Sequence, residues 1–376
     1  MNSFRKYYLI IFFIIFVDCV KQYNPPVLQA KNNYLVVDGF INAGTNQTTT
    51  ITLSRTRSIS DSVTATEPEL NASIQIVSND GNVYPLSEQG NGIYQSAALS
   101  LDNSKSYQLK IKASNGNNYS SALESCLKPP PVDSLTWKQQ NDVYVYLYTH
   151  DPENNTRYYK WDYIETWQYN SIYQTIYGVK NNLIYKLDTS NEIDSCWKTD
   201  ISTNILLGTS VNLSEDVINH AKIAIVPFND EKIYVRYSIL VRQWAITPDA
   251  YKYWQIVEKN SQDRGGLFDV QPGQLQGNIF SETDPTEPVI GFINASSETE
   301  SRLFINHKQV TDWGVGPHGC DIITISQDPN IFNYYDYPDT SYAPYHYVTP
   351  SGIALSKTTC LDCRTHDGVN KRPLFW

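Results

Sequence analysis

The fold of this chain is constrained most strongly by short segments in which apolar and polar residues alternate, separated by turn residues at intervals of about ten positions. The clearest turn is Asn79-Asp80-Gly81-Asn82, which follows the alternating segment Ala72–Val77. Asn and Gly at these positions are typical of a tight β-hairpin. Residues 34–127 are therefore predicted to form a β-sandwich of the immunoglobulin or transthyretin type.

The run Lys128-Pro129-Pro130-Pro131 interrupts this pattern. Proline has no backbone N–H to give to a β ladder, so the run predicts a stiff boundary between two domains. A chain of 376 residues is also longer than one core usually supports. We expect residues 132–376 to form a larger β-rich domain with at least one helix, which makes the protein mainly β.

Two long strands and one helix stand out in the second domain. One strand face carries aromatic residues around a carboxylate: Tyr159, Trp161, Tyr163, Glu165, Trp167 and Tyr169. The segment Lys232–Trp244 also alternates, with Arg242 on its polar side. Thr247 followed by Pro248 predicts the start of a helix over about 247–260. The Tyr- and Pro-rich segment Asn330–Tyr347 is expected to be an ordered surface loop.

The N-terminus has the parts of a secretory signal. A basic start precedes the apolar run Tyr7–Val17, and Cys19 follows directly after its end. The run is about half the length that spans a bilayer, so a stable transmembrane helix is not expected. The cysteine resembles that of the bacterial lipobox, where cleavage precedes acylation. We expect a signal peptide at 1–18, lipidation of Cys19 and a tether over 19–33; an ordinary secretory signal and an uncleaved signal anchor are the alternatives.

Several ordered sequence blocks lie along essentially the whole chain. They are Tyr34-Leu35-Val36-Val37-Asp38-Gly39, Ile51-Thr52-Leu53-Ser54-Arg55-Thr56, Pro131-Val132-Asp133-Ser134-Leu135, Trp161-Asp162-Tyr163-Ile164-Glu165-Thr166-Trp167, Tyr237-Ser238-Ile239-Leu240-Val241-Arg242-Gln243, Phe268-Asp269-Val270-Gln271-Pro272, Gly277-Asn278-Ile279, Val289-Ile290-Gly291-Phe292, and Cys360 and Cys363 with Lys371-Arg372-Pro373-Leu374-Phe375-Trp376. Together these blocks resemble the DUF4249 lipoproteins of the Bacteroidota.

The resemblance implies an outer-membrane lipoprotein, typically encoded beside a TonB-dependent transporter. In such loci the protein looks like a stand-in for the SusD-type lipoprotein that caps the transporter and captures its ligand. The expected partners are thus the transporter and, through the N-terminal lipid, the membrane. We expect a position on the cell surface, with the periplasmic face as the alternative.

Five cysteines remain after Cys19, in an oxidising compartment that favours disulfides. Cys320 is expected to pair with Cys360 or Cys363, which leaves the remaining thiols to Cys196 or Cys126. The alternative is a metal site built from Cys320, Cys360, Cys363 and His366, since a CxxC motif is common in zinc knuckles. The disulfides are preferred, and no metal or other cofactor is expected.

Two further sets of residues are candidates for a functional role. Glu165 is expected to form a buried ion pair with Arg242 or Arg236; the alternative is a carboxylate with a raised pKa in a sugar cleft. Tyrosines offer flat faces for sugars and rigid area for protein contacts. The candidates for ligand or partner contact are Tyr334, Tyr335, Tyr337, Tyr342, Tyr345 and Tyr347.

The function expected from these features is non-enzymatic. The net charge of −10 and the lack of a Lys/Arg cluster argue against a nucleic-acid partner. The sequence has no GxSxG elbow, HExxH motif or glycine-rich phosphate loop. We expect an accessory subunit of a TonB-dependent uptake system that captures a ligand or closes the barrel. A structural or envelope-assembly lipoprotein and a surface glycan hydrolase are the alternatives.

Overall fold

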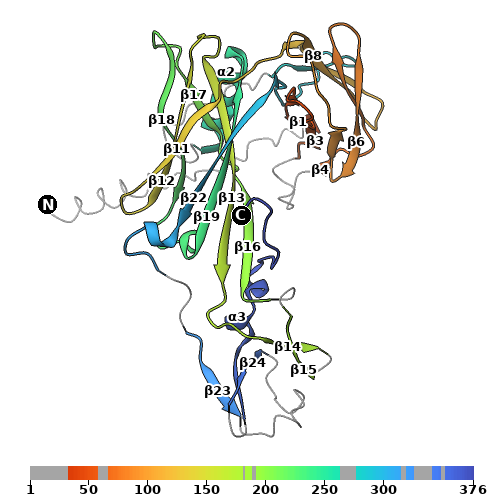
Figure 1. Cartoon of the computed structure of the whole chain (residues 1–376). Coiled ribbons are helices and arrows are strands. Elements are labelled where there is room, and N and C mark those ends of the chain that lie inside the picture. Colours follow the sequence, from red (N-terminus) through yellow and green to blue (C-terminus); the bar gives the residue numbers. More distant parts are fainter. Residues whose placement is uncertain are drawn as a thin grey trace, which may run out of the picture.

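The computed structural model describes residues 33–57, 67–180, 183–188, 192–262, 277–314, 319–325, 341–348 and 352–376. Figure 1 shows two β units side by side and an arm that extends away from the second unit. The predicted mainly β class is confirmed. The expected signal peptide and Cys19 lie outside the described residues. Within the described ranges, no helix combines the length and the apolar character needed to cross a membrane.

The first unit is an antiparallel sheet that wraps around one core, with the layers of the predicted sandwich joined into a continuous sheet. Its order is β1-β3-β7-β6-β5-β8-β9-β20, with β4 beside β3 and β10 beside β8. The strands are β1 (Leu35–Gly39), β3 (Thr50–Arg55), β4 (Glu67–Pro68), β5 (Ser73–Ser78), β6 (Val83–Gly90), β7 (Ile93–Ser96), β8 (Ser106–Lys112), β9 (Asn118–Ser121), β10 (Glu124–Ser125) and β20 (Ile279–Ser281). The predicted hairpin turn at 79–82 joins β5 to β6, with Gly81 at a positive φ of 88°.

A later part of the chain completes this first unit. Strand β20 pairs with β9, and β21 (Ala295–Ser296) pairs in parallel with β2 (Ile41–Asn42). Val289 and Ile293 are buried in the same core as the strands of the first unit. Residues 277–297, which the sequence-based division assigned to 132–376, thus lie on the first unit. The reason is that their apolar residues cover core positions that residues 34–127 leave open.

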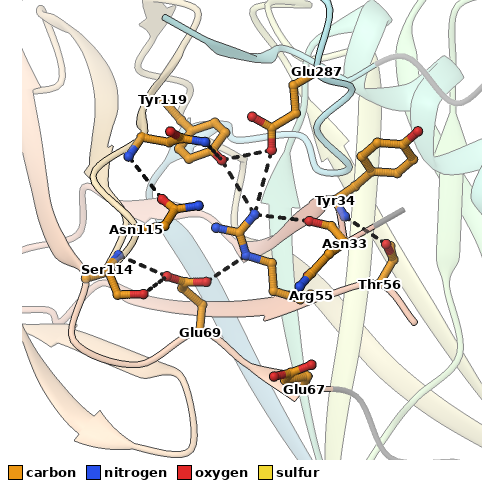
Figure 2. A network of polar contacts seen from close by, with 12 residues as sticks. Asn33, Tyr34, Arg55, Thr56, Glu67, Glu69, Ser114, Asn115, Tyr119 and Glu287 are labelled. Atoms are coloured by element: carbon orange, nitrogen blue, oxygen red, sulfur yellow. Dashed lines mark hydrogen bonds and ion pairs between the residues drawn. The ribbon is translucent and has the colours of Figure 1, made fainter. Parts of the chain in front are cut away.

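A buried polar network fastens residues 277–297, which we call the return segment, to the sheet (Figure 2). Arg55 of β3 donates through Nε to Glu69 at 2.6 Å, and its Nη1 lies 3.7 Å from Glu287 of the return segment. Tyr119 of β9 donates to the same Glu287 carboxylate at 2.9 Å. Ser114 donates to Glu69 through both its backbone N–H and its hydroxyl, at 3.0 and 2.7 Å. The network therefore joins two strands to a segment more than 150 positions later.

The second unit packs a three-stranded sheet against a five-stranded one, with their core between them. The smaller sheet consists of β11 (Val132–Gln139), β12 (Val143–Asp151) and β18 (Asp216–Val226). The larger sheet has the order β16-β13-β19-β22, with β17 also on β13; its strands are β13 (Tyr158–Asn170), β16 (Ser195–Ile201), β17 (Leu206–Thr209), β19 (Arg236–Ala245) and β22 (Glu298–Asn306). Short 3-10 turns, η1 (Glu231–Ile233) and η2 (His307–Gln309), flank β19 and β22.

The predicted strand Lys232–Trp244 begins later than expected. Asp230 accepts a hydrogen bond from the backbone N–H of Lys232 at 2.9 Å and thereby caps η1, so that strand β19 starts only at Arg236. The predicted helix is present as α2 (Pro248–Gln262), and the Thr247 hydroxyl accepts from the backbone N–H of Ala250 at 3.2 Å. Helix α2 packs against β13, β17 and Phe292 of the return segment.

The arm consists of short elements from two distant parts of the chain. They are β14 (Tyr177–Lys180), β15 (Leu183–Lys186), β23 (Ile322–Ile325), β24 (Tyr342–Tyr347), β25 (Ile353–Lys357), α3 (Thr358–Leu361) and η4 (Cys363–His366). Part of the expected surface loop is therefore a strand, because β24 pairs with β25. Figure 1 shows β13 and β16 running from the second unit toward this arm.

Candidate functional site

A cleft of about 480 Å³ lies where the first and second units meet. Strands β1 and β3 form one wall, and β13, β19 and α2 form the other. The side chains that define its chemistry are Asp38, Phe40, Lys160, Arg242, Trp244 and Trp254. A volume of this size fits a small organic molecule, and clefts between domains are common ligand sites. We refer to this feature as the interunit cleft.

Strand parity explains why these side chains face the cleft. On β13, the odd-numbered residues Tyr159 and Trp161 enter the core of the second unit, so that Lys160 and Asp162 point the other way. The register of β13 with β19 sets Lys160 opposite Trp244 and Asp162 opposite Arg242. Residues opposite one another on one sheet face are in contact range, so the two pairs form one surface patch.

Asp162 and Arg242 neutralise one another in a direct ion pair. Arg242 donates to both carboxylate oxygens of Asp162, from Nε and Nη2, each at 2.7 Å. Such a bidentate arrangement is a strong, directional form of ion pair. The Arg242 guanidinium also lies over the Trp244 ring, 5.3 Å from its centroid, and Phe40 meets that ring edge-on at 4.9 Å.

Lys160 has no such partner. Within the part of the chain that the structure describes, its amine forms no hydrogen bond and no ion pair. Instead, Nζ lies 5.4 Å from the centroid of the Trp244 ring and 4.7 Å from that of Trp254. Burial lowers the pKa of the Lys160 amine, against the opposing effect of the Asp162 and Asp38 carboxylates. A cation held only by two indole faces is available to a ligand.

The structure corrects the predicted Glu165–Arg242 pair. Glu165 accepts hydrogen bonds from Lys232 Nζ and from the Tyr237 hydroxyl, both at 2.6 Å. The pKa of Tyr237 is raised, first by its burial and then by the neighbouring Glu165 carboxylate. Arg242 stands on the opposite face of the sheet, where Asp162 is its neighbour. Because the Glu165 carboxylate is buried and already engaged, its geometry does not favour the hydrolase alternative.

The cysteines form two disulfides, Cys196–Cys363 and Cys320–Cys360. The predicted use of these residues in disulfides is confirmed, and the thiols of the alternative metal site are consumed. The fourth ligand of that alternative, His366, instead shares a 2.9 Å hydrogen bond with the Thr359 carbonyl through Nε2. Cys126 is half-buried and unpaired among the described residues, and burial raises the pKa of its thiol to about 11.

The candidate tyrosines that the structure describes belong to the arm and not to the interunit cleft. Tyr334, Tyr335 and Tyr337 lie outside the described residues. Tyr342, Tyr345 and Tyr347 are on β24, and the Tyr345 ring lies 5.0 Å from that of Tyr173. The structure therefore separates β24 from the cleft, and the use of the six tyrosines as contacts stays a prediction.

The residues that sequence reasoning missed are Lys160, Trp244 and Trp254. The alternation of β13 carries a signal for Lys160, since a lysine and an aspartate share its polar face next to an aromatic core face. The tryptophans carried no such signal, because their approach to Lys160 depends on strand register and on the packing of α2.

Comparisons with known proteins place the chain in a family without a known function. A sequence model of the family described as "Domain of unknown function (DUF4249)" matches residues 20–302. No curated protein matches the chain. Among solved structures, the adhesin InvE of Yersinia pseudotuberculosis is 14% identical, with a TM-score of 0.15; the match covers 57% of this chain and 57% of that one. A likeness of this extent supports no inference about function.

Proposed function

This chain belongs to the DUF4249 family, and from its structure we propose that it is a non-enzymatic subunit that captures a ligand for a TonB-dependent transporter of the outer membrane. The observation that carries the proposal is the interunit cleft. It offers aromatic surface and the Lys160 amine, which has no polar partner among the described residues, and both can contact a ligand.

The N-terminal sequence supports the proposed location. Acyl chains on Cys19 would hold the protein at the outer membrane, since two or three chains anchor stably where one does not. A lipid-anchored binding protein stays close to its transporter, which raises the effective concentration of the captured ligand at the barrel.

The arm supports a second candidate, a lipoprotein of envelope assembly. It is long and held by two disulfides, and it carries the half-buried Tyr342 and Tyr345 on β24. Rigid aromatic surface is suited to protein contacts. In this role the arm would bind another envelope protein, and no nutrient would have to bind in the cleft.

Purification of the tagged full chain from its own membranes separates the two candidates. The proposed function requires a stoichiometric barrel transporter in the mild-detergent eluate. The variant Cys19→Ala should leave the membrane fraction and lose the transporter. Recovery of envelope-assembly proteins without a transporter would favour the second candidate, and wild-type protein free in solution would contradict both.

A further inference from the structure

We propose that the interunit cleft binds a small organic monoanion with an apolar body, whose negative group pairs with Lys160. This inference rests on the proposed ligand-capture function and names its ligand class. It starts from the one cation of the cleft that lacks a polar partner among the described residues.

The aromatic contacts favour an anion over a sugar. Neutral sugars bind proteins by stacking on open indole faces, but here cations lie over both tryptophans. Lys160 lies over Trp244 and Trp254, and Arg242 lies over Trp244 as well. A carboxylate would instead receive a charge-assisted hydrogen bond from the Lys160 amine, a stronger contact than a neutral one.

The acidic residues of the cleft set the charge of the ligand. Asp162 neutralises Arg242, and exposed Asp38 stands on the opposite wall. Lys160 is thus left without an ion-pair partner among the described residues, and Asp38 would repel the two charges of a dianion more strongly than the single charge of a carboxylate. The cleft therefore suits a carboxylate better than a dianion such as a phosphate monoester.

The remaining walls set the body of the ligand. Phe40, Phe292, Ile246 and the tryptophans line the cleft, and its volume of about 480 Å³ exceeds what a carboxylate alone would fill. An apolar group next to the carboxylate would displace water from these side chains. The expected ligand is thus an amphipathic carboxylate.

The test compares phenylacetate with phenylacetamide, which has the same body without the charge. The full chain in mild detergent is titrated with each by isothermal titration calorimetry. We expect phenylacetate to bind about tenfold more tightly, as one charge-assisted hydrogen bond provides. The variant Lys160→Met should reduce this ratio to about one.

Two further variants make the test specific. Lys222 is a matched control, because its amine also lies over an aromatic ring, 5.9 Å from the centroid of Tyr144, but outside the cleft. Lys222→Met should keep the wild-type ratio. Asp162→Asn releases Arg242 from its ion pair and should strengthen phenylacetate binding several-fold; this result also serves if Lys160→Met does not fold.

The inference is overturned if neither probe binds, if both bind equally, or if the preference for phenylacetate survives Lys160→Met. These outcomes are distinct from those of the purification experiment. A chain that binds phenylacetate but recovers no transporter would refute only the proposed role in uptake. A chain that recovers a transporter but shows no preference would refute only the ligand class.

Discussion

At the scale of single residues, the buried Arg55–Glu69 pair makes stability depend on pH. Each side chain is only 7% exposed. Burial alone would raise the pKa of Glu69, but the hydrogen bonds from Arg55 and Ser114 outweigh it, so the pKa lies below the ordinary 4.5. The folded chain thus holds this carboxylate ionised where the unfolded chain takes up a proton.

This shift predicts the sign of the acid response. The stabilisation is fully present above the unfolded pKa, near 4.5, and is lost as the pH falls toward the lower folded pKa. In urea unfolding between pH 5 and about pH 3, the free energy of unfolding of Glu69→Gln should fall less steeply than that of the wild type. The difference in slope should correspond to at most about one proton taken up on unfolding. Glu67→Gln, at a side chain 52% exposed, is the control and should behave like wild type. Equal slopes for wild type and Glu69→Gln would refute the prediction.

The wrong partner predicted for Glu165 shows how far the alternation of residues along a strand can predict side-chain contacts. The alternation of β13 sets Glu165 and Asp162 on opposite faces, and that of β19 sets Arg242 on the polar face. Taken together, these two parities favour Asp162 as the partner of Arg242. The partner that Glu165 does use, Lys232, comes from the capped turn η1, which no strand pattern predicts.

At the scale of elements, the arm depends on its disulfides. Cys196–Cys363 and Cys320–Cys360 join residues 167 and 40 positions apart. Closing a loop of such length restricts the unfolded chain and stabilises the folded one by up to about 4 kcal/mol. The strands that the structure describes in the arm are short, so their contacts can replace little of that contribution.

We therefore expect reduction to loosen the arm before the two units. Limited proteolysis with dithiothreitol should cut first within 319–376, and Cys320→Ser with Cys360→Ser should reproduce this without reductant. Fragments from residues 67–127 should appear no faster than in the oxidised wild type. Cleavage in all three parts at the same rate would show that the disulfides do not hold the arm specifically.

Element types were predicted where the signal is local. The start of α2 followed from Thr247 and Pro248, and the hairpin at 79–82 from its turn residues. Strand β24 was expected to be a loop, because its pairing with β25 joins segments whose register no local pattern specifies. The same holds for β20 and β21, which are two or three residues long and too short to show alternation.

At the scale of the whole molecule, the return segment makes the first unit depend on residues after the proline run. Ile293 is fully buried among side chains from strands that precede the run. Ile293→Ala should lower the free energy of unfolding by about 2–5 kcal/mol, because it leaves a cavity. Hydrogen exchange should show lost protection within 67–127, although the altered residue lies far along the chain.

A matched isoleucine provides the control. Ile225 on β18 is 44% exposed, so Ile225→Ala should change the free energy of unfolding by no more than about 0.5 kcal/mol. Wild-type exchange rates within 67–127 for Ile293→Ala would show that the first unit is independent of the return segment. The interunit cleft follows from the same contact between distant segments, which is why the sequence did not predict it.

Strand β13 (Tyr158–Asn170) is continuous over 13 residues and carries both the cleft side chain Lys160 and Tyr169, which lies near the Cys196–Cys363 disulfide. It is about 40 Å long, and neighbours on both sides restrain it from bending alone. A force on the tip of the arm would therefore tilt the wall that carries Lys160. The five-stranded sheet would thus couple the position of the arm to the shape of the interunit cleft.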